Sequence, residues 1–142
     1  MSKHEPARTV VQGTGSFEVK SWDEKPYNEA EGLPRLTHST VTNAYQGVIE
    51  GEGTSASLMV YAADGSASFV SLDRVIGSVA GRSGSFVLQG SGTYDSAARI
   101  ARGDWFVVPG SATGDLAGLR GEGGFVAGHE PPGTITFDYY FE

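Results

Sequence analysis

Glycine recurs along this whole chain at short intervals, between apolar and aromatic runs. It accounts for 21 of the 142 residues, about twice the share of roughly 7% that is usual in proteins. The glycines do not form a low-complexity tract, and the chain also carries seven Phe, six Tyr and two Trp. Glycines in such a setting are typical of the turns, bulges and bends of a β protein. The chain is therefore expected to fold into many short strands and almost no helix.

The runs between the glycines have the composition of β-strands. Asp64-Gly65, between two such runs, predicts a hairpin with a type I′ turn, and a further turn is expected at residues 81–84. The longest irregular connection is expected over residues 23–34, and residues 96–102 could form at most one or two helical turns. The expected strands cover residues 10–22, 36–45, 47–61, 68–79, 85–89, 105–108, 125–127 and 134–141.

About eight short strands separated by turn residues are typical of a β-barrel or a β-sandwich. Several of the strands carry apolar residues on both faces, and this favours closure of an even number of antiparallel strands. The predicted fold class is therefore all-β, an eight-stranded antiparallel β-barrel that is lipocalin-like in shape. Residues 1–9 are expected to form a flexible N-terminal segment and residues 10–142 a single barrel domain.

Charge and composition exclude several kinds of partner. The chain has 10 Lys and Arg against 17 Asp and Glu, a net charge of −7 that repels phosphate backbones, so no nucleic acid is expected. The absence of cysteine excludes disulfides, zinc–cysteine sites and thiol catalysis. No signal peptide and no run of roughly 18 apolar residues is present. We therefore expect no membrane association and a cytoplasmic location.

Sequence signatures of metal and cofactor sites are missing. Residues 110–115 resemble a phosphate-binding loop only briefly, because they lack its Lys-Ser/Thr ending. His4, His38 and His129 lie far apart without zinc-ligand spacing, and no Gly-x-Ser-x-Gly elbow precedes a plausible triad. We expect no metal and no cofactor, with His38 on the surface.

Asp73 is the carboxylate with the most unusual sequence context. It lies in the middle of an expected strand, between apolar residues, and alternation places it on one face with Phe69, Ser71 and Val75. If that face lines the lumen, burial would raise the pKa of Asp73 and suit it to proton transfer. The alternative is a structural ion pair or a position at the rim.

Glu18 is the second catalytic candidate, because it could meet Asp73 or Arg82 across the lumen. The alternative is a solvent-facing Glu beside Lys20. Arg74 and Arg82 could each bind a ligand carboxylate in bidentate fashion, although Arg82 could instead anchor its own turn. Aromatic side chains could line a cavity for an apolar ligand or simply fill the core. The candidate substrate-binding residues are Trp22, Tyr61, Phe69, Arg82, Phe86 and Trp105.

Three phrases of the sequence resemble a known family. They are GSFEVKSW at residues 15–22, GRSGSFVLQ at residues 81–89 and VVPGSATGDLAGLRG at residues 107–121. In their order and spacing they resemble the bacterial domain of unknown function 3224 family, which is assigned to the allene oxide cyclase-like barrels, over nearly the whole chain. This chain departs from the family pattern at Gly90, where members often have His, and at residues 47–49, where they often have Gly-Asp-Leu.

The resemblance implies an eight-stranded barrel with a central cavity, whose structural relatives include cyclases of fatty-acid epoxides and polyketide intermediates. Our first hypothesis is a barrel that binds an apolar small molecule, as a cofactor-free cyclase or isomerase with Asp73 and Glu18 as its polar groups. The second is a non-catalytic carrier or sensor with the same cavity. The third is a solid barrel whose apolar outer face is buried in a homodimer, and this hypothesis predicts no cavity.

Overall fold

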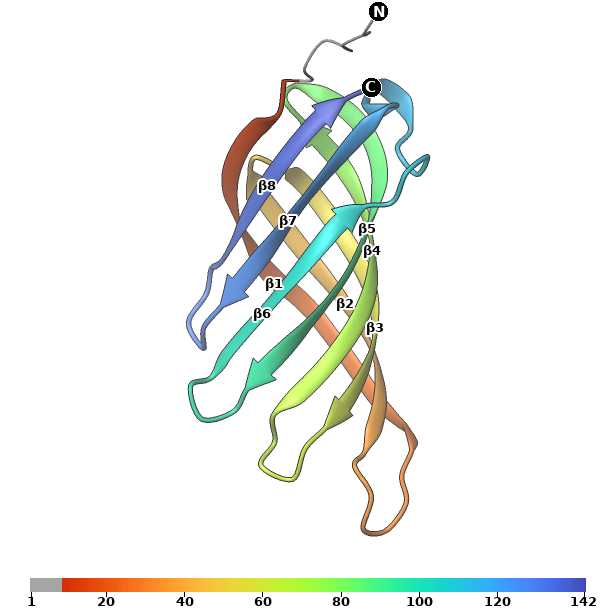
Figure 1. Cartoon of the computed structure of the whole chain (residues 1–142), viewed down its shortest axis with the longest axis vertical. Coiled ribbons are helices and arrows are strands. Elements are labelled where there is room, and N and C mark those ends of the chain that lie inside the picture. Colours follow the sequence, from red (N-terminus) through yellow and green to blue (C-terminus); the bar gives the residue numbers. More distant parts are fainter. Residues whose placement is uncertain (1–8) are drawn as a thin grey trace, which may run out of the picture.

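The fold is a closed barrel of eight antiparallel strands, each hydrogen-bonded to its neighbour in the sequence, with β8 pairing back onto β1 (Figure 1). This computed structural model describes residues 9–142, so the segment expected to be flexible lies outside the described residues except for its last residue. The strands are β1 (Val11–Asn28), β2 (Leu36–Gly47), β3 (Glu50–Tyr61), β4 (Ala67–Val79), β5 (Arg82–Asp95), β6 (Ile100–Val107), β7 (Leu119–Ala127) and β8 (Gly133–Phe141). The predicted fold class is confirmed.

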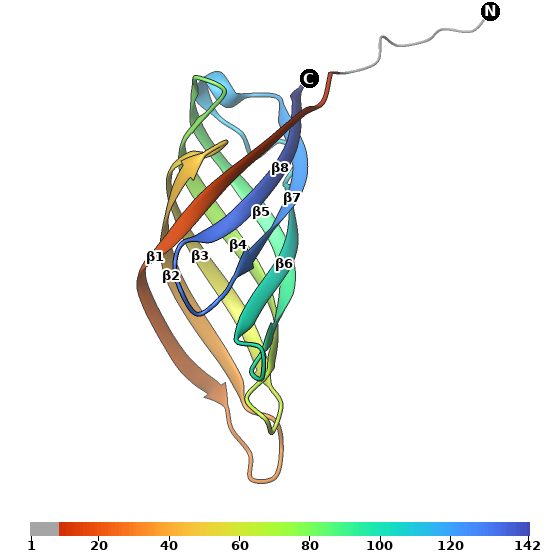
Figure 2. The same ribbon diagram turned by 90° about the vertical axis from the view of Figure 1, so that its left-hand side faces the viewer.

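The two ends of the barrel differ. The start of β1, the C-terminus and the β2–β3, β4–β5 and β6–β7 connections lie at one end, which we call the closed end (Figures 1 and 2). The β1–β2, β3–β4, β5–β6 and β7–β8 connections lie at the other, which we call the open end. The β6–β7 connection contains the short 3-10 helix η1 (Gly114–Leu116), whose Leu116 is fully buried. That connection therefore covers the closed end.

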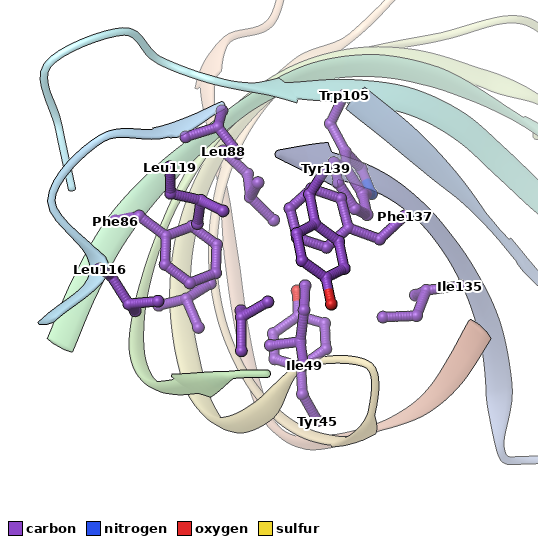
Figure 3. Close-up of a cluster of buried hydrophobic side chains, with 13 residues drawn as sticks. Tyr45, Ile49, Phe86, Leu88, Trp105, Leu116, Leu119, Ile135, Phe137 and Tyr139 are labelled. Atoms are coloured by element: carbon purple, nitrogen blue, oxygen red, sulfur yellow. The ribbon is translucent and has the colours of Figure 1, made fainter. Parts of the chain in front are cut away.

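Large apolar side chains fill the lumen at the closed end (Figure 3). Trp105 and Phe137 pack with ring centroids 5.3 Å apart, and Phe137 and Tyr139 with centroids 5.2 Å apart. Burial of such side chains is the main favourable contribution to folding, roughly 1.5–3 kcal/mol for each. The remaining buried members of this cluster are Tyr45, Ile49, Val75, Val79, Phe86, Leu88, Val107, Leu116, Leu119 and Ile135.

Several strands are longer than the sequence suggested. β1 continues to Asn28, so the longest irregular connection is not residues 23–34 but residues 108–118 between β6 and β7. β5 is one continuous strand, β6 begins at Ile100 and β7 at Leu119. Residues 96–99 form a turn and no helix. In the sequence, the glycines inside these strands resemble turn residues. In the structure, the strand pairing continues through them.

The turn predictions were partly wrong. The Asp64-Gly65 loop spans residues 62–66, and Gly65 alone in it has positive φ (+90°), so it is not a type I′ turn. The tight turn with two successive positive φ values lies instead between β4 and β5, where Ala80 has φ 54° and Gly81 has φ 77°. Positive φ at both central residues is the requirement of a type I′ hairpin.

Among residues 9–142, no helix has the length and apolar character needed to cross a membrane.

Candidate functional site

The lumen is hollow toward the open end. A cavity of about 370 Å³ lies between the packed closed end and the open-end connections, within the range of roughly 300–1,000 Å³ common for small-molecule pockets. The solid-barrel hypothesis predicted no cavity and does not fit this interior. The side chains and glycines that line it are Phe17, Val19, Trp22, Ser39, Val41, Asn43, Tyr45, Ser55, Ser57, Met59, Tyr61, Ala67, Phe69, Ser71, Asp73, Leu88, Gly90, Tyr94, Ala101, Trp105, Phe125, Ala127 and Ile135.

A row of small residues explains why this part of the barrel is hollow. Ser39 of β2 lies opposite Ser57 of β3, Ser57 opposite Ser71 of β4, and Ser71 opposite Gly90 of β5. All of them line the cavity. Side chains this small leave the middle of an eight-stranded barrel unfilled. Gly90 is thus part of the cavity wall.

Asp73 lies at the inner end of the cavity and is hydrogen-bonded to Tyr45. The Tyr45 hydroxyl donates to Oδ2 of Asp73 at 2.5 Å, and Asp73 is only 7% exposed. The face of β4 that carries Asp73 with Phe69 and Ser71 lines the lumen, as alternation along the strand suggested. Oδ1 of Asp73 is shut off from solvent, and no described residue donates a hydrogen bond to it.

Gly53 of β3 makes room for this pair. A Cβ atom at Gly53 would lie 2.6 Å from Oδ1 of Asp73, 2.9 Å from its Oδ2 and 2.8 Å from Cε2 of Tyr45. Such distances are well inside normal van der Waals contact, so a side chain at this position would displace both groups. The absence of a side chain at Gly53 is therefore what allows a carboxylate and a tyrosine ring to share this level of the lumen.

Burial shifts the titration of both partners. Burial raises the pKa of Asp73 above its ordinary value, and the hydrogen bond from Tyr45 offsets part of that rise. Burial, followed by the proximity of Asp73, raises the pKa of Tyr45 well above its ordinary value. The Tyr45 hydroxyl therefore stays protonated as a donor, while Asp73 binds its proton more tightly than an exposed Asp. This combination suits a group that takes up and returns a proton.

A second carboxylate, Glu24 of β1, lies near the mouth of the cavity. Its carboxylate accepts hydrogen bonds from Tyr61 at 2.5 Å, Thr37 at 2.7 Å and Nε1 of Trp22 at 3.0 Å. Burial alone would raise the pKa of Glu24, but these hydrogen bonds and the nearby charge of Arg35 outweigh it and hold the pKa below its ordinary value. Burial and the bond to Glu24 raise the pKa of Tyr61 to about 12. Glu24 is thus an ionised, fully engaged structural anion.

A β-bulge in β1 turns Trp22 and Glu24 inward. The pairing with β2 passes from Val19–Asn43 to Ser21–Thr42, so one residue is left without a partner. The bulge exchanges the two faces of the strand beyond it. Simple alternation placed Trp22 on the face opposite Phe17, but both line the cavity. The same exchange brings Glu24 to the inner face, whereas alternation counted from Phe17 assigns it to the outer face. For this reason Glu24 was not among the predicted site residues.

The structure brings together five of the eight predicted site residues. Phe86 is fully buried in the packed closed end, and Arg82 is exposed at the β4–β5 turn with its guanidinium 3.8 Å from the ring centroid of Phe141. Glu18 lies on the outer face with 57% of its side chain exposed, 3.6 Å from Lys20. Its predicted place in the lumen is therefore wrong, because that strand face points to solvent. The five that line the cavity are Trp22, Tyr61, Phe69, Asp73 and Trp105.

Other predicted groups also lie away from the cavity. Arg74, considered as a carboxylate-binding group, is exposed on the outer face of β4, and His38 is exposed on β2. Within residues 9–142, no three His, Asp or Glu side chains come close enough together to hold a metal ion. The carboxylates near the lumen, Asp73 and Glu24, are each committed to a tyrosine hydroxyl.

Comparisons with known proteins agree with the fold. The family described as "Protein of unknown function (DUF3224)" matches residues 13–139. A crystal structure of a protein with unknown function from that family, from Shewanella oneidensis MR-1, is similar with a TM-score of 0.79 and 29% sequence identity. The similarity covers 94% of this chain and 99% of that chain, while no curated protein matches. The resemblance to allene oxide cyclase-like barrels stays a prediction. The chain therefore belongs to the DUF3224 family of proteins of unknown function, as its three sequence phrases indicated.

Proposed function

We propose that this barrel binds a small, mainly apolar molecule in its lumen. The observation that carries the proposal is the division of the lumen into a packed closed end and a cavity of about 370 Å³ at the open end. The walls of that cavity are largely aromatic and aliphatic, with few polar groups, which is the composition usual for ligand pockets. A core built only for stability would be close-packed along its whole length.

Binding can be tested with toluene, which has no polar group. A saturating concentration should raise the midpoint of thermal unfolding, because a ligand at a hundred times its Kd stabilises the folded state by about 2.7 kcal/mol. Ser71→Phe should fill the cavity and remove the shift, and Ser57→Leu provides a second, smaller obstruction. Val70→Phe is the matched control, because Val70 precedes Ser71 on the outer face and is 55% exposed. A shift that survives both lumen variants would contradict the proposal.

The Asp73–Tyr45 pair favours a second, finer function, a cofactor-free isomerase or cyclase. A buried carboxylate can remove a proton from one carbon of a bound substrate and return it to another, so nothing is consumed and no cofactor is needed. The Tyr45 hydroxyl would hold the carboxylate in place through its 2.5 Å hydrogen bond. The lumen would contribute by holding a flexible substrate in one reactive conformation. Glu18 has no part in this scheme, because it lies outside the barrel.

A carrier and an isomerase differ in what leaves the cavity. Native mass spectrometry of the purified protein should detect a co-purified ligand, which can then be offered in isotopically labelled form. An isomerase converts it, and Asp73→Asn should slow the conversion by at least about a hundredfold. Release of the labelled molecule unchanged by the wild-type protein would contradict catalysis and leave the binding function intact.

A further inference from the structure

Among residues 9–142, the lining of the cavity includes one carboxylate, Asp73, and no basic side chain. Asp73 lines its inner end, and Glu24 hydrogen-bonds Trp22 and Tyr61, both of which line its outer part. Among residues 9–142, no Lys, Arg or His side chain lines the cavity. Arg35 stacks on the Tyr61 ring near the mouth, 4.9 Å from the ring centroid, and is not part of the wall. At the inner end, away from Arg35, a ligand carboxylate would therefore meet repulsion from Asp73 without a counter-charge in the wall.

Two acceptor oxygens at the inner end lack a donor. Oδ1 of Asp73 and Oδ1 of Asn43 are both shut off from solvent, and no hydrogen bond reaches either of them from the described residues. Both residues line the cavity. Buried polar atoms without a partner are uncommon in folded proteins and call for a specific explanation. Because Oδ2 of Asp73 is bonded to Tyr45, a donor in the cavity reaches Oδ1 when the carboxyl group turns about its broad terminal torsion and the Tyr45 hydroxyl follows that turn.

Aromatic rings surround this end of the cavity. Phe17 lies 6.2 Å from Tyr45 and 5.8 Å from Phe125, measured between ring centroids. The faces of such rings attract cations. A cation at the inner end would thus have a carboxylate as counter-charge and aromatic walls that tolerate its charge.

From these features we propose that the ligand is a protonated primary amine with an apolar body, and that its ammonium group binds Asp73 and Asn43. The inference rests on the proposed binding function and concerns recognition rather than turnover. An ammonium group has three donors and no acceptor, so it can supply both unpartnered oxygens, whereas an alcohol has a single donor. Hydrogen bonds between ionised partners are also roughly twice as strong as neutral ones.

Four compounds that share one ring and differ in the head group test the inference: phenethylamine, phenethyl alcohol, phenylacetate and toluene. Titration calorimetry on the full-length protein should give phenethylamine a Kd at least about tenfold lower than that of phenethyl alcohol. Phenylacetate should bind more weakly than the alcohol. Both tryptophans line the cavity, so their fluorescence provides an independent readout of the same binding.

Variants locate the head group. Asp73→Asn should weaken phenethylamine binding by about tenfold to a hundredfold and leave toluene within about threefold. Asn43→Leu, which keeps Asp73 and Tyr45 but removes the side-chain hydrogen bond between Asn43 and Tyr45, should also weaken amine binding and serves if Asp73→Asn does not fold. Glu18→Gln removes the same charge from the outer face and should leave amine binding unchanged.

The outcomes separate this inference from the binding function. If toluene binds but the amine gains nothing over the alcohol, or Asp73→Asn and Asn43→Leu keep full amine affinity, the amine inference is overturned and the binding function stands. Tighter binding of phenylacetate than of phenethylamine would overturn it equally. If none of the four compounds binds, the binding function fails and the inference with it.

Discussion

Replacing Gly53 with Ala tests whether the space above this glycine holds the Asp73–Tyr45 pair in place. The added Cβ would lie 2.6 Å from Oδ1 of Asp73 and 2.8 Å from Cε2 of Tyr45. Both partners are buried, at 7% and 8% exposure, and cannot swing into solvent. The φ angle of Gly53 is not in the left-handed region, so the backbone itself accepts alanine. The effect is therefore a steric one on the two side chains.

The expected size follows from three contributions. Overpacking of a filled interior costs about 1–3 kcal/mol, and losing the hydrogen bond from Tyr45 to the carboxylate costs about 1.5–3 kcal/mol. The smaller entropy of an unfolded chain with Ala in place of Gly returns about 0.4–1 kcal/mol. The net loss should be about 1.5–5.5 kcal/mol. For a chain of this length it corresponds to a fall of roughly 6–22 °C in the midpoint of thermal unfolding.

Thermal unfolding followed by circular dichroism measures this loss, with urea unfolding as a second determination. Gly128→Ala is the matched control, because a Cβ there would meet no atom within 4 Å, and it should change the free energy of unfolding by less than about 0.5 kcal/mol. The decisive comparison repeats Gly53→Ala in an Asp73→Ala background. If the steric explanation holds, the substitution should cost at least about 1 kcal/mol less there. An equal cost in both backgrounds would refute it.

Three further predictions follow. Because the pKa of Asp73 is raised, its stabilising contribution is present below the unfolded-state pKa and is lost as pH rises through the folded-state value. Among residues 9–142, Tyr45 is the ionisable group that acts on the titration of Asp73, and burial raises the pKa of Tyr45 well above its ordinary value. Between the unfolded-state and folded-state pKa values of Asp73, the free energy of unfolding measured with urea should decline less with rising pH in Asp73→Asn than in the wild type. An equal decline in both proteins would contradict the raised pKa of Asp73. Glu18→Gln should alter stability by less than about 0.5 kcal/mol, because the exposed pair with Lys20 contributes little. The homodimer stays a prediction: Leu72, 53% exposed on the outer face, would lie in its interface, and Leu72→Lys should then shift the sedimentation coefficient to that of a monomer, whereas a monomeric wild type would contradict it.

The fold could be predicted from the sequence because its signals are local. Turn glycines and the alternation of side chains along a strand can be recognised from neighbouring residues. Closure of the barrel was inferred from apolar residues on both faces of several strands. Asp73 was placed correctly because β4 runs without a bulge, so alternation from Phe69 to Val75 holds throughout. Its partner Tyr45 could not be predicted, since the two residues lie on non-adjacent strands and meet over Gly53 of the strand between them.

For Glu24 and Glu18, both on β1, prediction from the sequence failed. Glu24 lies near the cavity mouth and was not identified, while Glu18 was expected in the lumen and lies on the outer face. One unpaired residue after Val19 exchanges the faces of β1, so alternation counted from Phe17 assigns the wrong side to residues 21–26, up to the second register shift after Pro26. The sequence contains no signal for this bulge, because the residue there, Lys20, is neither Gly nor Pro. Glu24 would have been found only from its partners on β2 and β3, whose register depends on the bulge itself.

The cavity depends on a pattern that crosses strands instead of running along one. Ser39, Ser57, Ser71 and Gly90 are each an ordinary strand residue in their own segment, and only the register places them side by side. The row toward the closed end runs through Asp73 to Leu88, and beyond it the inward positions carry the large side chains of the packed core. The rigid closed end fixes the strand positions, so the residues facing the hollow part are free to be small. At Gly90 the small size is itself required, because a Cβ there would lie 2.6 Å from the backbone oxygen of Asp104 on β6 and 2.9 Å from Cβ of Trp105. The hollow part therefore depends on how closely β5 and β6 approach as well as on the small residues that face it.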